Sequence, residues 1–320
     1  MITLGKYRHL TQSSTAAGHF IILAIDHRAN LLSALNKHRI NATSDQEFMH
    51  FKLQVMKYLL PSASAVLTDP NFGVGQGITD GVISGKHGIL APLEETNYDV
   101  YPSQRQTNFI QGWSVEKIKR IGGSGVKLLL YYHPDDPTAP QKRTLVSKIV
   151  DQCRQFDIPF FLEPIAYSLD SERPLSTSEL RQVVVDSARE FSASGVDILK
   201  LEFPINPYQE SDEAVWLDAC MEVDSVCSIP WTILSAGVSF EIFRRQARIA
   251  CQAGASGVIV GRAVWNEAVE LQGAHRLNFL QSTACKRIEE LSLICEQNAV
   301  DWRERVPSPQ LTPNWYETYY

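Results

Sequence analysis

Residues 197–203 read DILKLEF, a short apolar run with one lysine, Lys200, at its centre. Similar runs occur at 125–132 (GVKLLLYY), which contains Lys127, and at 158–166 (IPFFLEPIA), which contains Glu163. Short continuous apolar runs are typical of strands that are buried on both faces, as in a parallel sheet. The three charged residues are therefore expected inside buried strands, where a charge needs a partner or a function.

The chain contains eight such strand-like runs, and stretches with helical periodicity separate them. The runs are 20–26, 64–69, 88–93, 125–132, 158–166, 197–203, 229–236 and 257–262. In 239–253, one helical face carries Ile242, Phe243, Ala247, Ala250 and Cys251. Eight strand and helix units over roughly 250 residues are typical of an α/β protein of the (β/α)8 TIM barrel class. We expect a single barrel domain over 1–320, with a helix of about 22 residues and an aromatic tail in an extension that begins near residue 274.

In such a barrel the active site lies at the carboxyl ends of the strands. Side chains alternate between the two faces of a strand, and in a barrel one of these faces is the interior. We expect Lys127, Glu163 and Lys200 on that interior face. Because the fourth, fifth and sixth strands are expected to be neighbours, these charges converge in the barrel interior. Asp26 ends the first run and is predicted to reach the same mouth. The polar segments 94–112 and 167–178 are predicted to be loops on this catalytic face.

Two amines and several carboxylates around one cavity suit a reaction in which a neutral amine attacks a carbonyl. Burial and a second nearby lysine both disfavour the ammonium form. The structural alternative is a buried salt-bridge network in which Lys127 pairs with Glu163, and Lys200 with Glu202. Such networks cost desolvation free energy and are seldom used for stability alone, so we interpret the set as functional. The role expected of Glu202 is to orient Lys200 or to cap the strand end.

A phosphate site is predicted at the last two strand ends, in LSAGVS (234–239) and VGRAVW (260–265). Barrel loops at these positions commonly bind phosphate, because glycine lets backbone N–H groups approach the anion and a helix dipole favours its charge. The candidate residues are Ser235, Ala236, Gly237, Gly261 and Arg262. Arg28 is a further candidate for binding an anionic group of the substrate, with a surface ion pair as the alternative.

Composition narrows the range of partners. The 320 residues are 44% hydrophobic with a formal net charge of −6, and the scattered lysines and arginines argue against binding to nucleic acid or an anionic membrane. The early apolar run FIILAI is too short to span a bilayer. The cysteines and histidines form no CxxC, HxxH or HExxH pair, so no metal or other cofactor is expected. We predict a cytoplasmic protein that acts on a small molecule and that assembles, if at all, as a homo-oligomer.

The residues above lie in segments that resemble class I tagatose-1,6-bisphosphate aldolases and, more broadly, related Schiff-base aldolases such as sulfofructose-phosphate aldolases. The resemblance runs from about residue 18 to DWRER (301–305). The matching segments are AIDHR, LTDPNFG, LEETNYD, VKLLLYYHPD, IPFFLEPIAY, DILKLEFPIN, LSAGVS and VGRAVW. The resemblance implies a Schiff base on Lys200, with Lys127, Glu163 and Asp26 as polar active-site residues, and phosphate binding by the SAG and GR motifs.

One motif departs from the family pattern. The family usually has Asp-Gln-Arg-Gly at the first strand end, where this chain has Asp26, His27, Arg28 and Ala29. Aspartate and arginine are kept, so the departure bears on the substrate more than on the type of reaction. The far end of the sugar is the part that such residues are expected to contact.

The resemblance implies reversible cleavage of a phosphorylated ketose, first of all tagatose 1,6-bisphosphate, to dihydroxyacetone phosphate and glyceraldehyde 3-phosphate. Lys200 would attack the C2 carbonyl, the protonated imine would accept electrons, and Glu163 or Asp26 would transfer protons. Sulfofructose 1-phosphate or another ketose 1-phosphate is the alternative substrate. Two other functions stay open: a phosphosugar isomerase with a carboxylate pair, and a regulatory protein that binds phosphosugars without turnover.

Overall fold

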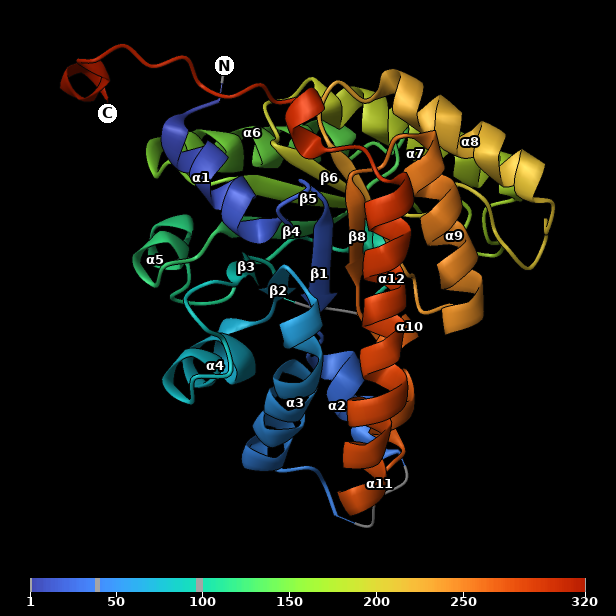
Figure 1. Cartoon of the computed structure of the whole chain (residues 1–320). Coiled ribbons are helices and arrows are strands. Elements are labelled where there is room, and N and C mark those ends of the chain that lie inside the picture. Colours follow the sequence, from blue (N-terminus) through green and yellow to red (C-terminus); the bar gives the residue numbers. More distant parts are fainter. Residues whose placement is uncertain (1, 38–40, 96–99, 320) are drawn as a thin grey trace.

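The computed structural model describes residues 2–37, 41–95 and 100–319, and a closed barrel of eight parallel strands lies at its centre (Figure 1). The strands are β1 Phe20–Ala24, β2 Ala65–Leu67, β3 Gly88–Pro92, β4 Gly125–Tyr131, β5 Phe160–Ile165, β6 Ile198–Leu201, β7 Trp231–Leu234 and β8 Gly257–Val260. Each strand pairs with the next, and β8 closes the barrel on β1. The predicted fold class and all eight strands are confirmed, each strand being shorter than its apolar run.

Helices separate the strands and surround the barrel. They are α1 Leu4–Ser13, α2 Ala29–Asn36, α3 Asp45–Leu59, α4 Gly75–Thr79, α5 Val115–Arg120, α6 Ala139–Gln155, α7 Thr177–Ser192, α8 Glu213–Val226, α9 Phe240–Ala253, α10 Arg262–Trp265, α11 Gly273–Phe279 and α12 Cys285–Asn298. At the start of α3, Ser44 and Glu47 form a capping box that satisfies free backbone N–H groups. In α9 the predicted apolar face is confirmed, because Phe243, Ala247, Ala250 and Cys251 are buried and Ile242 is partly buried against the core.

The barrel wall divides the apolar core in two. Strand residues that face outward, such as Leu128 and Leu162, pack with the helices. Inside the barrel, Phe161 belongs to a second cluster, and its ring meets that of Phe20 edge-on with centroids 6.0 Å apart. Trp302 stacks on Phe20 at 6.5 Å. Because Phe161 precedes Glu163 by two residues on the same face, this apolar cluster fills the barrel on the amino-terminal side of the charged residues.

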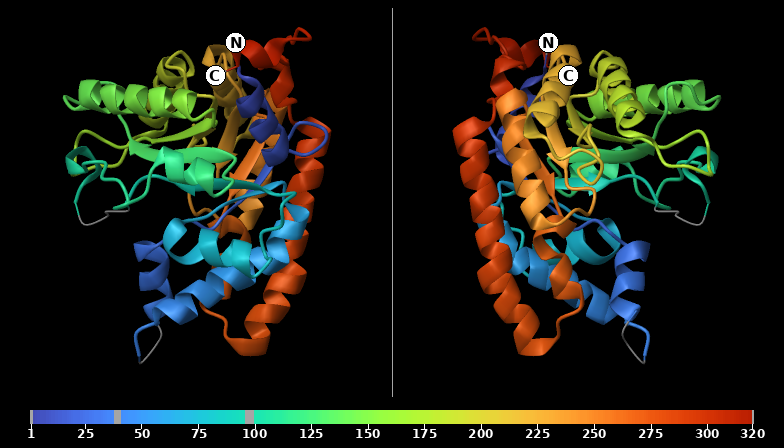
Figure 2. Two further views of the ribbon diagram at one scale, coloured as in Figure 1. Left: turned by 90° about the vertical axis from the view of Figure 1, so that its left-hand side faces the viewer. Right: turned by 90° about the vertical axis from the view of Figure 1, so that its right-hand side faces the viewer.

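A long helical segment follows the barrel. A π-helical turn at Leu280–Ala284 joins α11 to α12, so the predicted helix of the extension is present and spans 273–298. Figure 2 shows α12 running along one side of the barrel and beyond it, and contacts join it to α3 and α9. In the aromatic tail, Trp302 is buried. Tyr319 contacts the start of α1, where its hydroxyl accepts a hydrogen bond of 2.7 Å from the Gly5 backbone N–H. Within the described residues, no helix has the length and apolar character that crossing a membrane requires.

Candidate active site

A cavity of about 390 Å³ lies at the carboxyl ends of the barrel strands. Strands β1 and β3 to β8, or the residues directly after them, contribute to its lining. Its charged lining residues are Asp26, Glu94, Lys127, Glu163, Lys200, Glu202 and Arg262. In Figure 1 the arrow of β1 points toward α2 and α3, which lie on this side of the barrel. The charged residues of the apolar runs are therefore gathered at the end where a barrel carries its active site.

Lys127, on β4, is held by three carboxylates. Its Nζ lies 3.1 Å from Asp26 Oδ2, 2.7 Å from Glu94 Oε1 and 2.9 Å from Glu163 Oε2. Burial opposes a charged amine, but these carboxylates together raise the pKa of Lys127 well above its usual value. Lys127 is therefore an ammonium group at neutral pH and is unsuited to act as a nucleophile.

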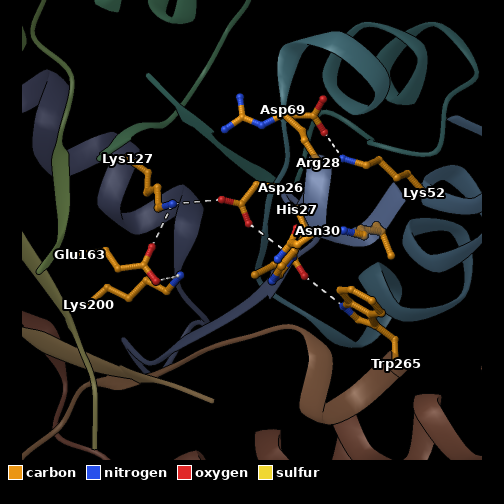
Figure 3. A network of polar contacts seen from close by, with 12 residues as sticks. Asp26, His27, Arg28, Asn30, Lys52, Asp69, Lys127, Glu163, Lys200 and Trp265 are labelled. Carbon is orange, nitrogen blue, oxygen red and sulfur yellow. Dashed lines mark hydrogen bonds and ion pairs between the residues drawn. The ribbon is translucent and has the colours of Figure 1, made fainter. Parts of the chain in front are cut away.

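Lys200, on β6, pairs with Glu163 on β5, and 2.8 Å separate Lys200 Nζ from Glu163 Oε1. Glu163 thus bridges the two lysines, as Figure 3 shows. The convergence predicted from strand alternation is confirmed. Of the two pairs in the structural alternative, Lys127–Glu163 is present, whereas Lys200 pairs with Glu163 in place of Glu202.

The three carboxyls around Lys127 differ in their proton affinity. Burial favours the neutral acid in each of them. In Asp26 and Glu163 the nearby lysines outweigh burial and lower the pKa. In Glu94 burial outweighs Lys127 and raises the pKa. Across the described residues no three His, Cys, Asp or Glu side chains are grouped as a metal site would need, and these carboxyls are instead arranged around an ammonium group.

Glu202 lies two residues after Lys200 and also lines the cavity. Its Oε2 accepts a hydrogen bond of 2.6 Å from the Ala166 backbone N–H, which links the ends of β5 and β6. This contact agrees with the expected strand-capping role. Burial raises the pKa of Glu202 to about 7, and the charge of Glu163 acts in the same direction. Glu202 is therefore a cavity carboxyl that changes its protonation near neutral pH.

His27 lines both this cavity and a smaller one of about 100 Å³ beside it. Its ring meets Trp265 edge-on at 5.4 Å, and its Nδ1 lies 3.8 Å from Asp26 Oδ1. Trp265 is itself fixed, because its Nε1 donates to the Ala24 carbonyl at 3.0 Å (Figure 3). Burial lowers the pKa of His27 to about 3. At physiological pH the ring is therefore neutral.

The loops after β7 and β8 meet at the cavity mouth. Ser235, Ala236, Gly261 and Arg262 line the cavity, whereas Gly237 does not. Gly237 lies against the side chain of Arg262. A Cβ at Gly237 would lie 3.3 Å from Arg262 Cζ, so the guanidinium rests against bare backbone. The side chain of Arg262 has no ion pair or hydrogen bond with a described residue. An unpaired arginine beside turn N–H groups suits a phosphate.

Arg28 is not among the residues that line the cavity. Its Nη2 donates a hydrogen bond of 2.6 Å to the Glu94 carbonyl, and Figure 3 shows its side chain near Asp69 and Lys52, away from Lys200. The structure therefore separates this predicted substrate-binding residue from the others. Its guanidinium supports the backbone of Glu94 and does not face the cavity.

Sequence reasoning did not single out Glu94, since it falls at the start of a segment expected to be a loop. Glu94 follows the last residue of β3 by two positions, and Asp26 follows the last residue of β1 by the same number. Asp69 follows β2 by two positions as well, yet it pairs with Lys52 outside the cavity lining. This offset therefore does not identify Glu94 by itself, and Asn30, which also lines the cavity, has no sequence signal either.

A second buried ion pair lies outside the cavity lining. Lys52 of α3 contacts Asp69, which follows β2, and both side chains are fully buried. Asp69 Oδ1 also accepts a hydrogen bond of 2.9 Å from the Phe72 backbone N–H. The pair joins α3 to the end of β2, the one strand that contributes nothing to the cavity lining.

Comparison with known proteins agrees with this geometry. Residues 20–267 match the family described as DeoC/LacD family aldolase. The chain is 33% identical to the tagatose 1,6-diphosphate aldolase of Listeria monocytogenes serotype 4b, with 94% of each chain covered. It is 32% identical to tagatose 1,6-diphosphate aldolase 2 of Streptococcus mutans, with 94% of this chain and 97% of that one covered.

Two solved structures are also similar to this chain. The first is a Schiff base forming fructose-1,6-bisphosphate aldolase, with a TM-score of 0.61, 17% identity and coverage of 91% of this chain and 99% of that one. The second is the fructose-bisphosphate aldolase from Slackia heliotrinireducens, with a TM-score of 0.64, 11% identity and coverage of 98% and 96%. At these identities the likeness concerns the fold.

Proposed function

Because the chain belongs to the DeoC/LacD family of aldolases, we propose that it cleaves tagatose 1,6-bisphosphate reversibly through a Schiff base on Lys200. The products are dihydroxyacetone phosphate and glyceraldehyde 3-phosphate. Family membership supports the reaction class. The two bacterial relatives named above, which cover nearly the whole chain, support the choice of substrate.

One observation carries the choice of Lys200 as the nucleophile. Its side chain is 6% exposed, lines the cavity and has one carboxylate, Glu163, within ion-pairing distance among the described residues. Lys127, by contrast, is surrounded by three carboxylates. Deprotonation of Lys200 therefore disrupts one ion pair, whereas deprotonation of Lys127 would leave three buried carboxylates without their cation.

In the cleavage direction the amine of Lys200 attacks C2 of the ketose. Loss of water from the resulting carbinolamine leaves an iminium ion. Glu163 Oε1, at 2.8 Å from Lys200 Nζ, is placed to take a proton from the amine and to return one to the leaving hydroxyl. The permanent ammonium of Lys127 stabilises negative charge that develops on substrate oxygens.

A base then removes the proton of the C4 hydroxyl, and the C3–C4 bond breaks as its electron pair enters the iminium. Glu163 is our candidate for this base, and Asp26 is the alternative because it also contacts Lys127. The aldehyde leaves, the enamine takes a proton at C3, and hydrolysis frees Lys200. Arg262 and the turn at 235–237 are proposed to hold the C1 phosphate, so that C2 reaches the amine.

Borohydride trapping with tagatose 1,6-bisphosphate, followed by peptide mapping, tests the nucleophile. We expect the added mass on Lys200. Lys200→Arg should lose both trapping and cleavage, because a guanidinium does not form the imine. A matched control is Lys6→Arg, since Lys6 is a buried lysine that pairs with Asp197 at 2.8 Å and does not line the cavity. Cleavage without an adduct on Lys200 would show that the assignment is wrong.

A coupled assay for dihydroxyacetone phosphate tests the substrate. Tagatose 1,6-bisphosphate, fructose 1,6-bisphosphate and sulfofructose 1-phosphate are compared with and without EDTA. We expect tagatose 1,6-bisphosphate to have the highest kcat/KM and cleavage to persist in EDTA. A preference for sulfofructose 1-phosphate would favour the alternative substrate. Isomerisation by Lys200→Arg would favour the isomerase, and thermal stabilisation by these sugars without cleavage would favour the regulatory protein.

A further inference from the structure

Glu94 is a buried carboxyl that the proposed mechanism leaves without a task. Its side chain lines the cavity, and the residue is 3% exposed. Oε1 accepts a hydrogen bond of 2.7 Å from Lys127 Nζ. Oε2 is buried too, and it has no hydrogen-bond partner among the described residues. A buried polar atom without a partner costs free energy that a ligand can recover.

The backbone around Glu94 fixes the direction of its side chain. Glu94 forms a β-bridge with Phe109, and its carbonyl accepts the hydrogen bond from Arg28 Nη2. Lys127 holds one carboxyl oxygen from the barrel interior. These contacts leave Oε2 as the polar atom of Glu94 that is free to meet a ligand in the cavity.

Glu94 differs from the other two carboxyls of this group in its surroundings. Asp26, Glu94 and Glu163 all contact Lys127, and Glu163 also contacts Lys200. Burial raises the pKa of Glu94, whereas the lysines lower those of Asp26 and Glu163. Because Oε1 already faces the ammonium group of Lys127, Oε2 is the oxygen of Glu94 left for a hydroxyl of the ligand.

The barrel order places Glu94 at the far end of the substrate. In a closed barrel of eight strands, β3 lies four strands from β7 in either direction. The turn at 235–237, which follows β7, is therefore across the mouth from Glu94. A ketose with its C1 phosphate at this turn and C2 at Lys200, on neighbouring β6, extends its remaining carbons toward β3.

We propose that Glu94 binds the C5 hydroxyl of the ketose through Oε2 and thereby selects aldehydes that carry a hydroxyl next to the carbonyl. This inference rests on the proposed function. C4 carries the hydroxyl that the base beside Lys200 deprotonates, and C5 is the next carbon toward β3. A substrate without the C5 hydroxyl leaves Oε2 unpaired, which is how a buried polar group rejects an analogue.

Condensation of dihydroxyacetone phosphate with two aldehydes isolates this contact. D-glyceraldehyde and 3-hydroxypropanal differ in the hydroxyl that becomes the C5 hydroxyl of the product. We expect the wild type to favour D-glyceraldehyde in kcat/KM by on the order of 10- to 100-fold, the range that one unpaired buried group produces. In Glu94→Leu this ratio should fall to within about threefold of one.

Two further variants sharpen the test. Glu94→Gln keeps a hydrogen-bonding group at the position of Oε2 and should retain most of the preference. Glu95→Leu changes the neighbouring exposed residue and should behave as the wild type. If Glu94→Leu does not fold, Glu94→Ala is measured in its place. An unchanged ratio in that variant, no preference in the wild type, or equal losses in Glu94→Gln and Glu94→Leu would each overturn the inference.

Borohydride trapping of dihydroxyacetone phosphate on Lys200 separates this inference from the proposed function. That half of the reaction does not involve C5, so each Glu94 variant should trap as the wild type does. Absence of trapping in the wild type would refute the proposed function. Normal trapping combined with an unchanged aldehyde ratio in Glu94→Leu would refute the role of Glu94 alone.

Discussion

Glu163 joins the two lysines of the cavity, with Oε1 at 2.8 Å from Lys200 Nζ and Oε2 at 2.9 Å from Lys127 Nζ. One carboxylate on β5 thus contacts cations from both adjacent strands. Lys127 keeps two further carboxylates when Glu163 moves a proton, whereas Lys200 has none among the described residues. This asymmetry separates a fixed cation from a lysine that can react.

Replacement of Glu163 by glutamine should lower kcat for ketose cleavage on the order of 10²- to 10⁴-fold, the usual contribution of a positioned acid-base group. Glutamine keeps the size of the side chain but does not exchange the proton with Lys200. Steady-state kinetics with the preferred ketose measures the effect, and circular dichroism checks the fold. Wild-type kcat in Glu163→Gln would exclude Glu163 as the proton carrier.

The Lys52–Asp69 pair provides a prediction about stability. Lys52→Met leaves a fully buried carboxylate without its cation and should lower the free energy of unfolding by about 3–5 kcal/mol. Lys52→Met combined with Asp69→Asn should recover most of this loss, because asparagine can still accept the hydrogen bond from Phe72 N–H. Urea unfolding of both variants measures the difference. A single variant as stable as the wild type would contradict the prediction.

His27 should make the protein sensitive to mild acid. Its pKa is lowered to about 3, mainly by burial, with Asp26 opposing the shift and Arg262, Lys200 and Lys52 adding to it. The unfolded chain therefore binds a proton near pH 6.5 that the folded chain refuses, and stability is lost as the pH falls below 6.5.

His27→Gln removes that proton site. Relative to the wild type, its free energy of unfolding should improve by ~2 kcal/mol between pH 7.5 and pH 5. Urea unfolding across this range gives the comparison. Parallel pH profiles for the two proteins would show that His27 is protonated as easily in the folded chain as in the unfolded one.

The raised pKa of Glu202 predicts that the stability of the fold changes with pH in the direction opposite to the effect of His27. Burial raises its pKa to about 7, so the folded chain holds a proton that the unfolded chain releases near pH 4.5. Stability therefore falls as the pH rises from about 4.5 to 7. Glu202→Gln keeps an acceptor for Ala166 N–H and cannot ionise, so its melting temperature should exceed that of the wild type more at pH 8 than at pH 5. The same difference at both values would argue against a raised pKa.

Local sequence patterns were sufficient to predict the strands and the three charged residues at the centre of the site. The apolar runs around Lys127, Glu163 and Lys200 identified buried strands, and the period of two placed the three charges on interior faces. Predicting their neighbours was harder. Glu94 stood at a loop boundary, and its contact with Lys127 spans 33 positions in the sequence. Arg28 stands two positions after Asp26 in the motif, yet its side chain donates to the Glu94 carbonyl, a contact that depends on where β3 ends.

The sequence by itself determined the barrel and the chemistry of its interior, because strand burial and side-chain alternation are local properties of each run. It also predicted a phosphate site in the loops after β7 and β8, and the structure brings both loops to the cavity. Only the tertiary structure decided how the charges pair. Glu163 contacts both Lys127 and Lys200. This shared pairing depends on the register of β4, β5 and β6 and on the reach of Asp26 and Glu94 across the mouth. These are distances between strands remote in sequence, which no local pattern encodes.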